Sequence, residues 1–326
     1  MHILITGAAG MIGQKLVARL IKDGALHGAT IARLTLTDIV APPAPAFNGS
    51  TEIIAADLPA PGVAERLVAG RPEVIFHLAG VVSAEAELDL EKGYRVNLDG
   101  TRALLEAVRR AGGGYRPKFI YTSSCAVFGA PFPEAIPDDF HLTPLTSYGT
   151  AKAMCELLLA DYTRRGFLDG VGLRLPAICV RPGKPNRAAS GFFSSIIREP
   201  LAGKEAILPV PEDTLHTHAS PRAAVSYLIH AAGLSRAQLG PRINLTMPGV
   251  CCTVAEQIDA LRRIAGDKVA ARIRRAPDEL VARIVAGWPH RFDARRALAL
   301  GFVPERNFDE IIRIHIEEDL GGRIAA

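Results

Sequence analysis

The sequence predicts an α/β protein in which a doubly wound parallel sheet is covered by helices on both faces. Short apolar segments typical of strands alternate with longer segments of helical periodicity along the first half of the chain. The first apolar segment also runs directly into a glycine-rich loop that opens a helical segment. Because ligands of such sheets bind beyond the carboxyl ends of the strands, we expect the functional residues where the strand segments end.

The composition is that of an ordinary globular protein. Of 326 residues, 48% are hydrophobic and 22% are charged, so the chain can bury a large core. The net charge is only +4 and no basic tract with interleaved aromatic residues occurs, which argues against a nucleic-acid partner. No apolar run is long enough to span a membrane and no signal peptide is recognisable, so we expect a cytoplasmic protein with no membrane partner.

The five cysteines are typical of free thiols in a reducing compartment. They follow no CxxC spacing and have no nearby histidine at zinc-binding spacing, so the sequence predicts neither disulfides nor a metal site. They are Cys125, Cys155, Cys179, Cys251 and Cys252.

The N-terminal segment indicates a phosphate-binding loop. Residues 1–6 read as a buried strand, residues 7–13 follow a GxxGxxG pattern, and a helical segment continues to about Asp23. A tight strand-to-helix turn and a close approach of backbone to phosphate both need glycine, and the helix N-terminus offers free N–H groups to a pyrophosphate. A glycine-rich turn without a ligand is the alternative. The residues expected at the phosphates are Gly7, Gly10, Met11, Ile12 and Gly13.

Asp38 indicates which dinucleotide binds. The strand segment 31–37 ends at this carboxylate, which can accept hydrogen bonds from the adenosine ribose and repels a 2′-phosphate. No basic residue follows directly, so NAD is favoured over NADP as the cofactor. Asp38 could also merely cap a turn before the proline-rich loop 41–50.

Further candidate residues stand at later strand ends. The segment 52–56 leads to Asp57 and Leu58, which are suited to contacting adenine, and the segment 74–80 ends in the small residues Ala79 and Gly80. A long helical segment, about 88–111, carries Asn97, which is mildly unfavourable inside a helix and therefore invites a functional explanation.

Tyr148 and Lys152 are the candidate catalytic pair. They are four residues apart in a helical segment, about 147–165, so they share one helical face. A phenol has an ordinary pKa of about 10, and an adjacent ammonium lowers that pKa by favouring the phenolate. The segment 118–121 leads into Thr122, Ser123 and Ser124, and the Ser124 hydroxyl could hold the substrate oxygen. Alone, a YxxxK pair could equally be a packed tyrosine beside a solvated lysine.

Taken in order, these motifs resemble the extended short-chain dehydrogenase/reductase family, which includes nucleotide-sugar epimerases and dehydratases. The resemblance implies a Rossmann-type fold and makes Tyr148 the acid/base, Lys152 the ligand of the nicotinamide ribose, and Ser124 the substrate-binding serine. Ser124 is preferred to Ser123 because it lies five residues before Gly129, which is the family spacing. Phe128 departs from the tyrosine common at its position, with little expected effect. The cofactor residues include Asn97 and Thr122, and Pro176 and Ile178 are expected to border the nicotinamide.

The second half of the chain is expected to form mainly a substrate-binding lobe. We expect a dinucleotide-binding domain over residues 1–175, to which the chain later returns, and the lobe over residues 176–326. A strand segment at 171–175 precedes helical segments near 191–199, 221–232, 254–265 and 276–286, with a short strand near 242–245. By family analogy the protein is expected to be a homodimer joined through the helices at 88–111 and 147–165.

The segment 181–191 is rich in cations and hydroxyls and suits a small acidic substrate. Arginine matches a carboxylate with two parallel hydrogen bonds, and Arg187, or less surely Arg181, is the expected clamp. These arginines could also be solvated loop residues. His218 could donate to the substrate or simply satisfy the core. The expected substrate residues are Ser83, Ser124, Tyr148, Arg181, Arg187, Ser190 and His218.

Three segments, 181–187, 191–203 and 215–220, resemble a subgroup of the family that oxidises a four-carbon sugar acid with NAD. That resemblance implies oxidation of the C2 hydroxyl of D-erythronate to 2-dehydro-D-erythronate in acid-sugar catabolism. Uronate dehydrogenation and nucleotide-sugar epimerisation or dehydration are the alternatives within the family. A non-catalytic NAD-sensing protein is a remote alternative, because such proteins often lack the Tyr/Lys pair.

Overall fold

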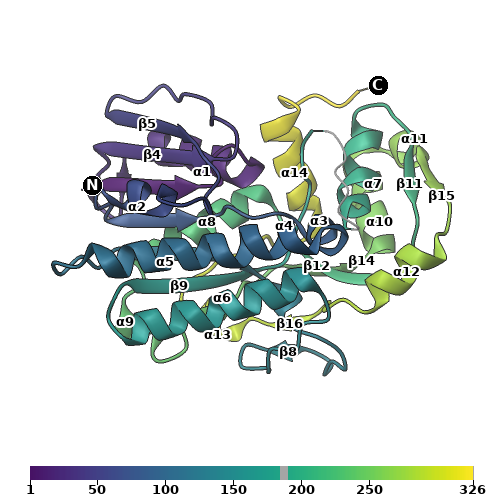
Figure 1. The fold of residues 1–326 in the computed structure, drawn as a ribbon. Coiled ribbons are helices and arrows are strands. Elements are labelled where there is room, and N and C mark those ends of the chain that lie inside the picture. Colours follow the sequence, from purple (N-terminus) through teal and green to yellow (C-terminus); the bar gives the residue numbers. More distant parts are fainter. Residues whose placement is uncertain (184–189, 326) are drawn as a thin grey trace. The chain divides into compact units, whose positions relative to one another are not determined.

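The structure, a computed structural model, describes residues 1–183 and 190–325. The chain folds into two compact units. The first contains residues 1–127, 144–174 and 225–246, and the second contains residues 128–143, 175–224 and 247–326. Figure 1 labels the helices and strands along the chain.

The first unit contains a seven-stranded sheet in the order β13-β9-β7-β6-β1-β4-β5. The pairs β1–β4, β1–β6, β4–β5, β6–β7 and β13–β9 are parallel, which confirms the predicted parallel sheet. The strands are β1 (His2–Thr6), β4 (Arg33–Asp38), β5 (Ser50–Ala55), β6 (Val74–His77), β7 (Lys118–Ser124), β9 (Asp169–Leu175) and β13 (Asn244–Thr246). A small hairpin of β2 (Ala25–Leu26) and β3 (Ala29–Thr30), which was not predicted, follows the first helix.

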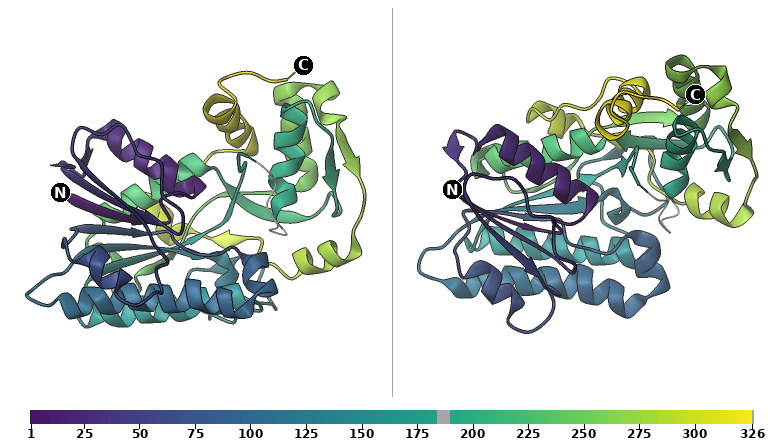
Figure 2. Two further views of the ribbon diagram at one scale, coloured as in Figure 1. Left: turned by 45° about the horizontal axis from the view of Figure 1, so that its top comes forward. Right: turned by 90° about the horizontal axis from the view of Figure 1, so that it is seen from above.

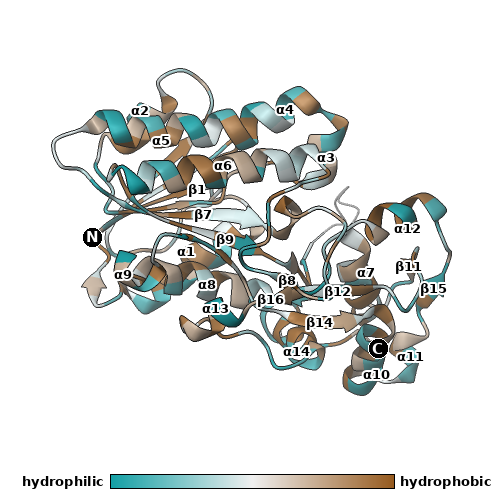
Figure 3. Ribbon diagram, turned by 90° about the horizontal axis from the view of Figure 1, so that it is seen from below, coloured by the Kyte–Doolittle hydropathy of each residue, from teal (hydrophilic) through white to brown (hydrophobic). Residues whose placement is uncertain are grey.

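Helices cover both faces of this sheet. Figures 2 and 3 show α5 and α6 together on one face and α1 on the other. The face under α5 and α6 is filled by fully buried side chains such as Leu104, Phe119 and Leu159. The helices are α1 (Met11–Asp23), α2 (Val63–Val68), α3 (Ser83–Leu88), α4 (Leu90–Tyr94), α5 (Gly100–Ala111), α6 (Ser147–Arg164) and α9 (Arg236–Leu239). α8 (Pro221–Gly233) begins in the second unit and ends in the first.

The helix expected over residues 88–111 is interrupted. α4 ends at Tyr94, residues Arg95–Asp99 form one turn of π-helix, and α5 begins at Gly100. The predicted continuous helix was therefore wrong at this point. Single π turns are frequent at functional sites, and the turn here is centred on Asn97.

The second unit is built from short strands around its own apolar core. β10 (Ala177–Ile178), β12 (Leu215–Ala219) and β14 (Val250–Thr253) form a three-stranded sheet, β11 (Ala206–Leu208) pairs with β15 (Ile273–Arg275), and β8 (Ile136–Pro137) pairs with β16 (Phe292–Asp293). The helices are α7 (Gly191–Leu201), α10 (Val254–Ala265), α11 (Asp267–Ala270), α12 (Glu279–Ala286), α13 (Arg295–Ala299) and α14 (Phe308–Asp319), with a 3-10 turn at Cys125–Val127 in the first unit. The core packs α7, α10 and α14 together, with Phe193, Ile258 and Ile312 among its buried side chains.

Among the described residues, no helix is both long and apolar enough to cross a membrane.

Candidate functional site

The loop between β1 and α1 has the geometry of an anion-binding cradle. Gly7 has φ +74°, and a Cβ there would lie 2.7 Å from the backbone nitrogen of Ala79. A Cβ on Gly13 would lie 2.2 Å from the carbonyl oxygen of Gly7, so neither position has room for a side chain. α1 starts after Gly10 with no side-chain cap and no acidic residue in its first turn. The first N–H groups of the helix are therefore left to bind an anion such as a pyrophosphate.

Asp38 is tied to this cradle. Its two oxygens accept hydrogen bonds from the backbone nitrogens of Ala9, at 2.9 Å, and Ile39, at 2.7 Å. The carboxylate thus both orders the local turn and is held beside the glycine loop at the end of β4. An ionised carboxylate has lone pairs for further hydrogen bonds, which leaves capacity for ribose hydroxyls.

Asp57 has a partner that sequence reasoning missed. One oxygen lies 2.5 Å from Nη1 of Arg95, so the side chain is paired with a cation from the π turn. Leu58 is buried and packs in the core of the first unit. The predicted contacts of Asp57 and Leu58 with adenine stay predictions.

Asn97 holds the loop that follows β6. Its Oδ1 accepts from the backbone nitrogen of Val81 at 2.9 Å, and its Nδ2 donates to the carbonyl of the same residue at 3.2 Å. The π turn exposes the Asn97 carbonyl, which accepts from the Thr101 hydroxyl at 2.7 Å and from the Cys155 thiol at 3.3 Å. The side chain fixes the backbone just after Ala79 and Gly80, where the cofactor residues were predicted.

Lys152 and Tyr148 extend from the first two turns of α6. The Lys152 side chain is buried, and its Nζ donates to the carbonyl of Thr122 at 2.7 Å. The same nitrogen lies 5.7 Å from the ring centroid of Tyr148 and 4.9 Å from that of Tyr121. A Cβ on Gly149 would lie 2.1 Å from the carbonyl of Ala126, so the start of α6 is pressed against the turn that follows β7. The geometry places the ammonium of Lys152 beside the aromatic ring of Tyr148.

The two serines at the end of β7 have different surroundings. Ser123 is buried and donates to Glu156 at 2.6 Å. Ser124 is half-buried, and its Oγ accepts from the backbone nitrogen of Ala126 at 3.1 Å. No described residue accepts the hydroxyl proton of Ser124 in a hydrogen bond, so this proton remains available to a ligand. The local geometry therefore favours Ser124 over Ser123 as the substrate-binding serine.

His77 is a buried site residue that sequence reasoning missed. Its ring hydrogen-bonds Thr6 at 2.7 Å and Thr101 at 2.9 Å, and thus joins β1, β6 and α5. Burial, with a smaller contribution from the Lys152 charge, lowers the pKa of His77 to about 3, so the ring is neutral at ordinary pH. Its carbonyl accepts from Thr122 at 3.0 Å. A lone polar residue within the apolar segment 74–78 was the available signal.

The remaining residues that were predicted to bind cofactor or substrate lie in different surroundings. Ser83 is half-buried at the start of α3 in the first unit. In the second unit Pro176 is buried, Ile178 is half-buried on β10, and Arg181 donates to the Ile178 carbonyl at 3.0 Å and to Ser190 at 3.3 Å. Arg187 lies outside the described residues.

His218 is completely buried in the second unit. Its Nε2 hydrogen-bonds the amide nitrogen of Gln257 at 2.7 Å, and its ring packs edge-on against Phe193 and Phe308. Burial lowers the pKa of His218 well below its usual value. Of the two roles considered for His218, these contacts favour the structural one.

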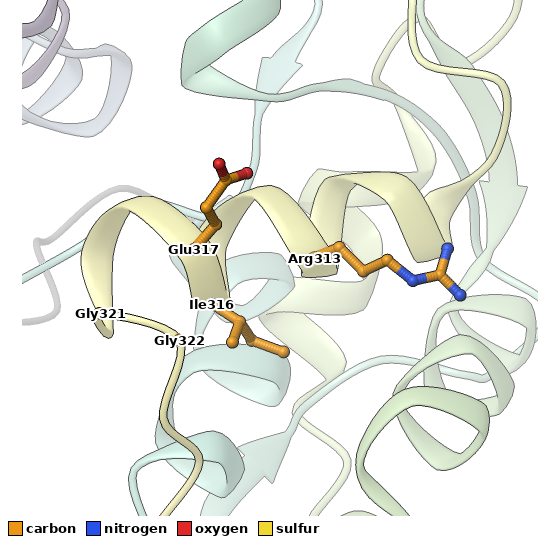
Figure 4. A pocket seen from close by; sticks show the side chains of 5 residues that line it. All are labelled: Arg313, Ile316, Glu317, Gly321 and Gly322. Atoms are coloured by element: carbon orange, nitrogen blue, oxygen red, sulfur yellow. The ribbon is translucent and has the colours of Figure 1, made fainter.

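A shallow depression in the second unit contains none of the predicted site residues. It has a volume of about 500 Å³ and lies at the C-terminal end of α14, where Arg313, Ile316, Glu317, Gly321 and Gly322 line it (Figure 4). Its two charged side chains point away from one another, and nothing in its lining indicates a reaction.

Comparisons with known proteins agree with this geometry. Residues 3–217 match the family described as the NAD dependent epimerase/dehydratase family. A D-erythronate dehydrogenase from Cupriavidus necator is 46% identical over 322 residues, covering 98% of each chain. Another D-erythronate dehydrogenase, from Haemophilus influenzae, is 41% identical over 320 residues and covers 98% of this chain and 100% of the relative.

A solved structure is still more similar. The nucleoside-diphosphate-sugar epimerase from Agrobacterium tumefaciens superposes with a TM-score of 0.98 at 61% sequence identity. The alignment covers 100% of this chain and 96% of that one.

Proposed function

Because the chain belongs to the NAD dependent epimerase/dehydratase family, we propose that it oxidises the C2 hydroxyl of D-erythronate to 2-dehydro-D-erythronate with NAD. One observation carries the proposal: two relatives named D-erythronate dehydrogenase match it over almost their whole length, at 46% and 41% identity. We assign the cofactor and the reacting groups to the first unit, and recognition of the rest of the substrate to the second.

The residues of the first unit fit NAD, the cofactor of this family. The side-chain-free surface of Gly7 and Gly13 and the uncapped start of α1 suit the pyrophosphate. Asp38 would accept hydrogen bonds from the adenosine ribose, and Lys152 would donate to the nicotinamide ribose. Pro176 and Ile178, which belong to the second unit, remain the residues expected from the sequence to border the nicotinamide. When bound, NAD supplies the acceptor for the hydride that leaves C2.

Side chains of the protein would bind the C2 hydroxyl and accept its proton. Ser124 and Tyr148 would both hydrogen-bond the C2 hydroxyl of the acid and so hold the C2 carbon in place. As the hydride leaves C2 with two electrons, the C2–O bond becomes a carbonyl and the hydroxyl proton passes to the Tyr148 phenolate. The Lys152 ammonium lies 5.7 Å from the centre of the Tyr148 ring.

The carboxylate of the substrate needs a cation in the second unit. Arg187 and Arg181 remain the candidates from the sequence, because a guanidinium binds a carboxylate with two parallel hydrogen bonds. The Arg181 guanidinium is held in place by the hydrogen bonds that it donates to the Ile178 carbonyl and the Ser190 hydroxyl.

A panel of substrates tests the proposed function. Sugar acids of four to six carbons would be incubated with NAD and separately with NADP, and formation of the reduced nicotinamide would be followed. We expect the highest kcat/KM for D-erythronate with NAD. Highest activity on a uronate would favour the uronate dehydrogenase alternative. Activity only on nucleotide sugars, with NAD that co-purifies with the protein, would favour the epimerase alternative, and activity only with NADP would contradict the assignment of Asp38.

Replacing Asp38 by asparagine should weaken the preference for NAD. The substitution keeps the size of the side chain and an oxygen for the Ala9 N–H, but it removes the charge that repels a 2′-phosphate. At the few ångströms that separate such groups, one charge interaction near a protein surface is worth several kcal/mol before screening. We therefore expect the ratio of kcat/KM for NAD to that for NADP to fall by about tenfold or more. Asp23→Asn, which alters an exposed carboxylate at the end of α1, is the matched control and should leave the ratio unchanged.

We also propose that the protein is a homodimer located in the cytoplasm. Met154 and Leu157 of α6 and Leu88 and Leu90 beside it are exposed large apolar side chains. Such a surface suits the homodimer contact expected through α5 and α6. All five cysteines are free, which is compatible with the cytoplasmic location expected from the sequence.

A further inference from the structure

His77 lies in the middle of a buried chain of hydrogen bonds within the first unit. Its Nδ1 is 2.7 Å from the Thr6 hydroxyl, and its Nε2 is 2.9 Å from the Thr101 hydroxyl. The Thr101 hydroxyl donates onward to the Asn97 carbonyl at 2.7 Å, and the Thr6 hydroxyl accepts from the backbone nitrogen of Ala79 at 3.3 Å. The four side chains of this chain are each no more than 2% exposed, so its hydrogen bonds are shielded from water.

One arrangement of protons satisfies the whole chain. A carbonyl oxygen only accepts, so the Thr101 hydroxyl gives its proton to Asn97 and must itself accept from Nε2–H of His77. Burial lowers the pKa of His77 to about 3, so the ring is neutral and carries a single N–H. Nδ1 is then an acceptor, and the Thr6 hydroxyl donates to it while accepting from the backbone. The network therefore holds His77 in the Nε2-protonated tautomer.

Both ends of the chain lie at the backbone where parts of the candidate cofactor site meet. The glycine loop begins directly after β1, and a Cβ on Gly7 would lie 2.7 Å from the backbone nitrogen of Ala79. A Cβ on Gly80 would lie 2.9 Å from Oδ1 of Asn97 and 3.8 Å from Nζ of Lys152. The glycine loop, the π turn and the lysine therefore approach this short stretch of backbone closely.

The hydrogen bonds hold the segment 79–81 at both of its ends. The N–H of Ala79 starts the chain that passes through His77 to the Asn97 carbonyl. The Asn97 side chain then returns to the same segment, since it bonds both the backbone nitrogen and the carbonyl of Val81. The segment is thus fixed by a closed set of hydrogen bonds that needs no ligand.

We infer that His77 is a positioning residue for the cofactor: its single tautomer keeps the segment 79–81 in the conformation in which NAD binds. The inference rests on the proposed placement of NAD in the first unit, and it gives a role to a completely buried ring. A segment that is ordered before binding spares the free-energy cost of ordering it on binding. Breaking the chain should therefore weaken the binding of NAD and leave Ser124 and Tyr148 able to react.

Thr101→Val breaks the chain with little change of volume. Valine removes the hydroxyl, so Nε2–H of His77 loses its acceptor and the Asn97 carbonyl loses a donor. We expect the dissociation constant of NAD, measured by calorimetry, to rise about tenfold, because a buried polar group is left unpaired. The KM for NAD should rise by the same factor, while kcat at saturating NAD stays within about twofold of the unaltered value.

Two further variants separate positioning from stability. Thr101→Ser keeps the hydroxyl and should return the NAD affinity to within about twofold of that of the unaltered protein. Thr163→Val is the matched control, because it makes the same substitution at another buried threonine of the first unit, whose hydroxyl has no partner among the described residues. It should leave the dissociation constant unchanged.

The outcome for NAD distinguishes this inference from the proposed function. If Thr101→Val is less stable but binds NAD as tightly as the unaltered protein, the chain is merely structural and the inference is wrong, while the proposed function stands. If Thr101→Ser binds NAD as weakly as Thr101→Val, the hydroxyl is not the cause and the inference is again overturned. If the unaltered protein binds no NAD, the proposed function fails and this inference fails with it.

The tautomer can be measured in the unaltered protein, which covers the case in which Thr101→Val does not fold. Nitrogen-15 NMR distinguishes a protonated from an unprotonated ring nitrogen. We expect Nε2 of His77 to be protonated and Nδ1 to be unprotonated throughout the neutral pH range, both before and after NAD is added. The opposite tautomer, a mixture of the two, or a change of tautomer on addition of NAD would show that the chain is not formed in advance and would overturn the inference.

Discussion

Tyr148→Phe is expected to lower kcat on the sugar-acid substrate by at least about 10³-fold and to leave NAD binding almost unchanged. The substitution removes one oxygen, which in the proposed reaction accepts the proton as the hydride leaves. Proton transfer by a positioned side chain typically contributes 10²- to 10⁴-fold. The glycine loop, Asp38 and Lys152 keep their own contacts, so the dissociation constant of NAD should change little. The measurements are kcat from initial rates and NAD affinity from calorimetry.

Tyr162→Phe is the matched control for this prediction. Tyr162 lies on the same helix, α6, but its hydroxyl donates to Glu106, which is remote in sequence from the candidate catalytic residues. Removing that hydroxyl should leave turnover within about twofold, since no reacting group depends on it. Turnover by Tyr148→Phe at a near-normal rate would contradict the proposed chemistry, and a comparable loss in Tyr162→Phe would indicate that the defect lies in folding.

The first unit could be predicted well because its signals are local. A buried strand, a glycine loop and an amphipathic helix follow one another within 23 residues. β1 lies within a residue of its predicted position and α1 ends at Asp23 as predicted, but α1 begins at Met11, inside the segment predicted as the loop. α6 begins at Ser147, where Thr146 caps it by accepting from Gly149. Periodicity and spacing carry such information because helices and strands are largely decided by neighbours in sequence.

Contacts between segments distant in sequence could not be predicted from local sequence patterns. The π turn at Asn97 depends on Thr101, Cys155 and the backbone of Val81, which meet only in the folded chain. The short strands β11 and β15 are 65 residues apart in sequence and have too few residues to show a periodicity of their own. In both cases tertiary contacts, which leave little trace in local sequence, decide the conformation.

The same contrast between local patterns and long-range contacts applies to the residues of the candidate site. The choice of Ser124 over Ser123 came from spacing and is supported by the burial of Ser123 against Glu156. The expectation for the segment 215–220 selected His218 as a possible donor to the substrate, whereas the structure packs its ring against Phe193 and Phe308. The burial of His218 is produced by Phe193 and Phe308, which come from elsewhere in the chain, so no local pattern in the sequence revealed it.

The ion pair between Glu156 and Arg174 yields the second prediction with a large effect. Glu156 is completely buried on α6, and Arg174 on β9 is almost completely buried. Arg174 donates to both carboxylate oxygens, with Nη2 at 2.8 Å and Nε at 3.0 and 3.1 Å, and Ser123 donates to the same carboxylate. Together with Ser123, the pair therefore links β7, α6 and β9.

Glu156→Ala is expected to lower the free energy of unfolding by about 3–5 kcal/mol, because it leaves the Arg174 charge buried without its counter-ion. Urea denaturation followed by far-ultraviolet circular dichroism would measure the loss, with the two units treated as separate transitions if two appear. Asp23→Ala, which breaks the exposed pair with Arg19, should cost less than about 1 kcal/mol and is the matched control.

Removing both charges distinguishes the stability that the ion pair contributes from the cost of leaving one charge buried without a partner. Replacing Glu156 by leucine and Arg174 by methionine together fills similar volume with apolar groups, and such replacements are often neutral. The double variant should therefore be clearly more stable than Glu156→Ala, although Ser123 still loses its acceptor. If Glu156→Ala stays within about 1 kcal/mol of the unaltered protein, water or a rearranged partner must satisfy Arg174. The ion pair would then contribute little to the free energy of unfolding. Lys152, one turn earlier on α6, would be positioned only by its hydrogen bond to the Thr122 carbonyl and by the packing of the helix.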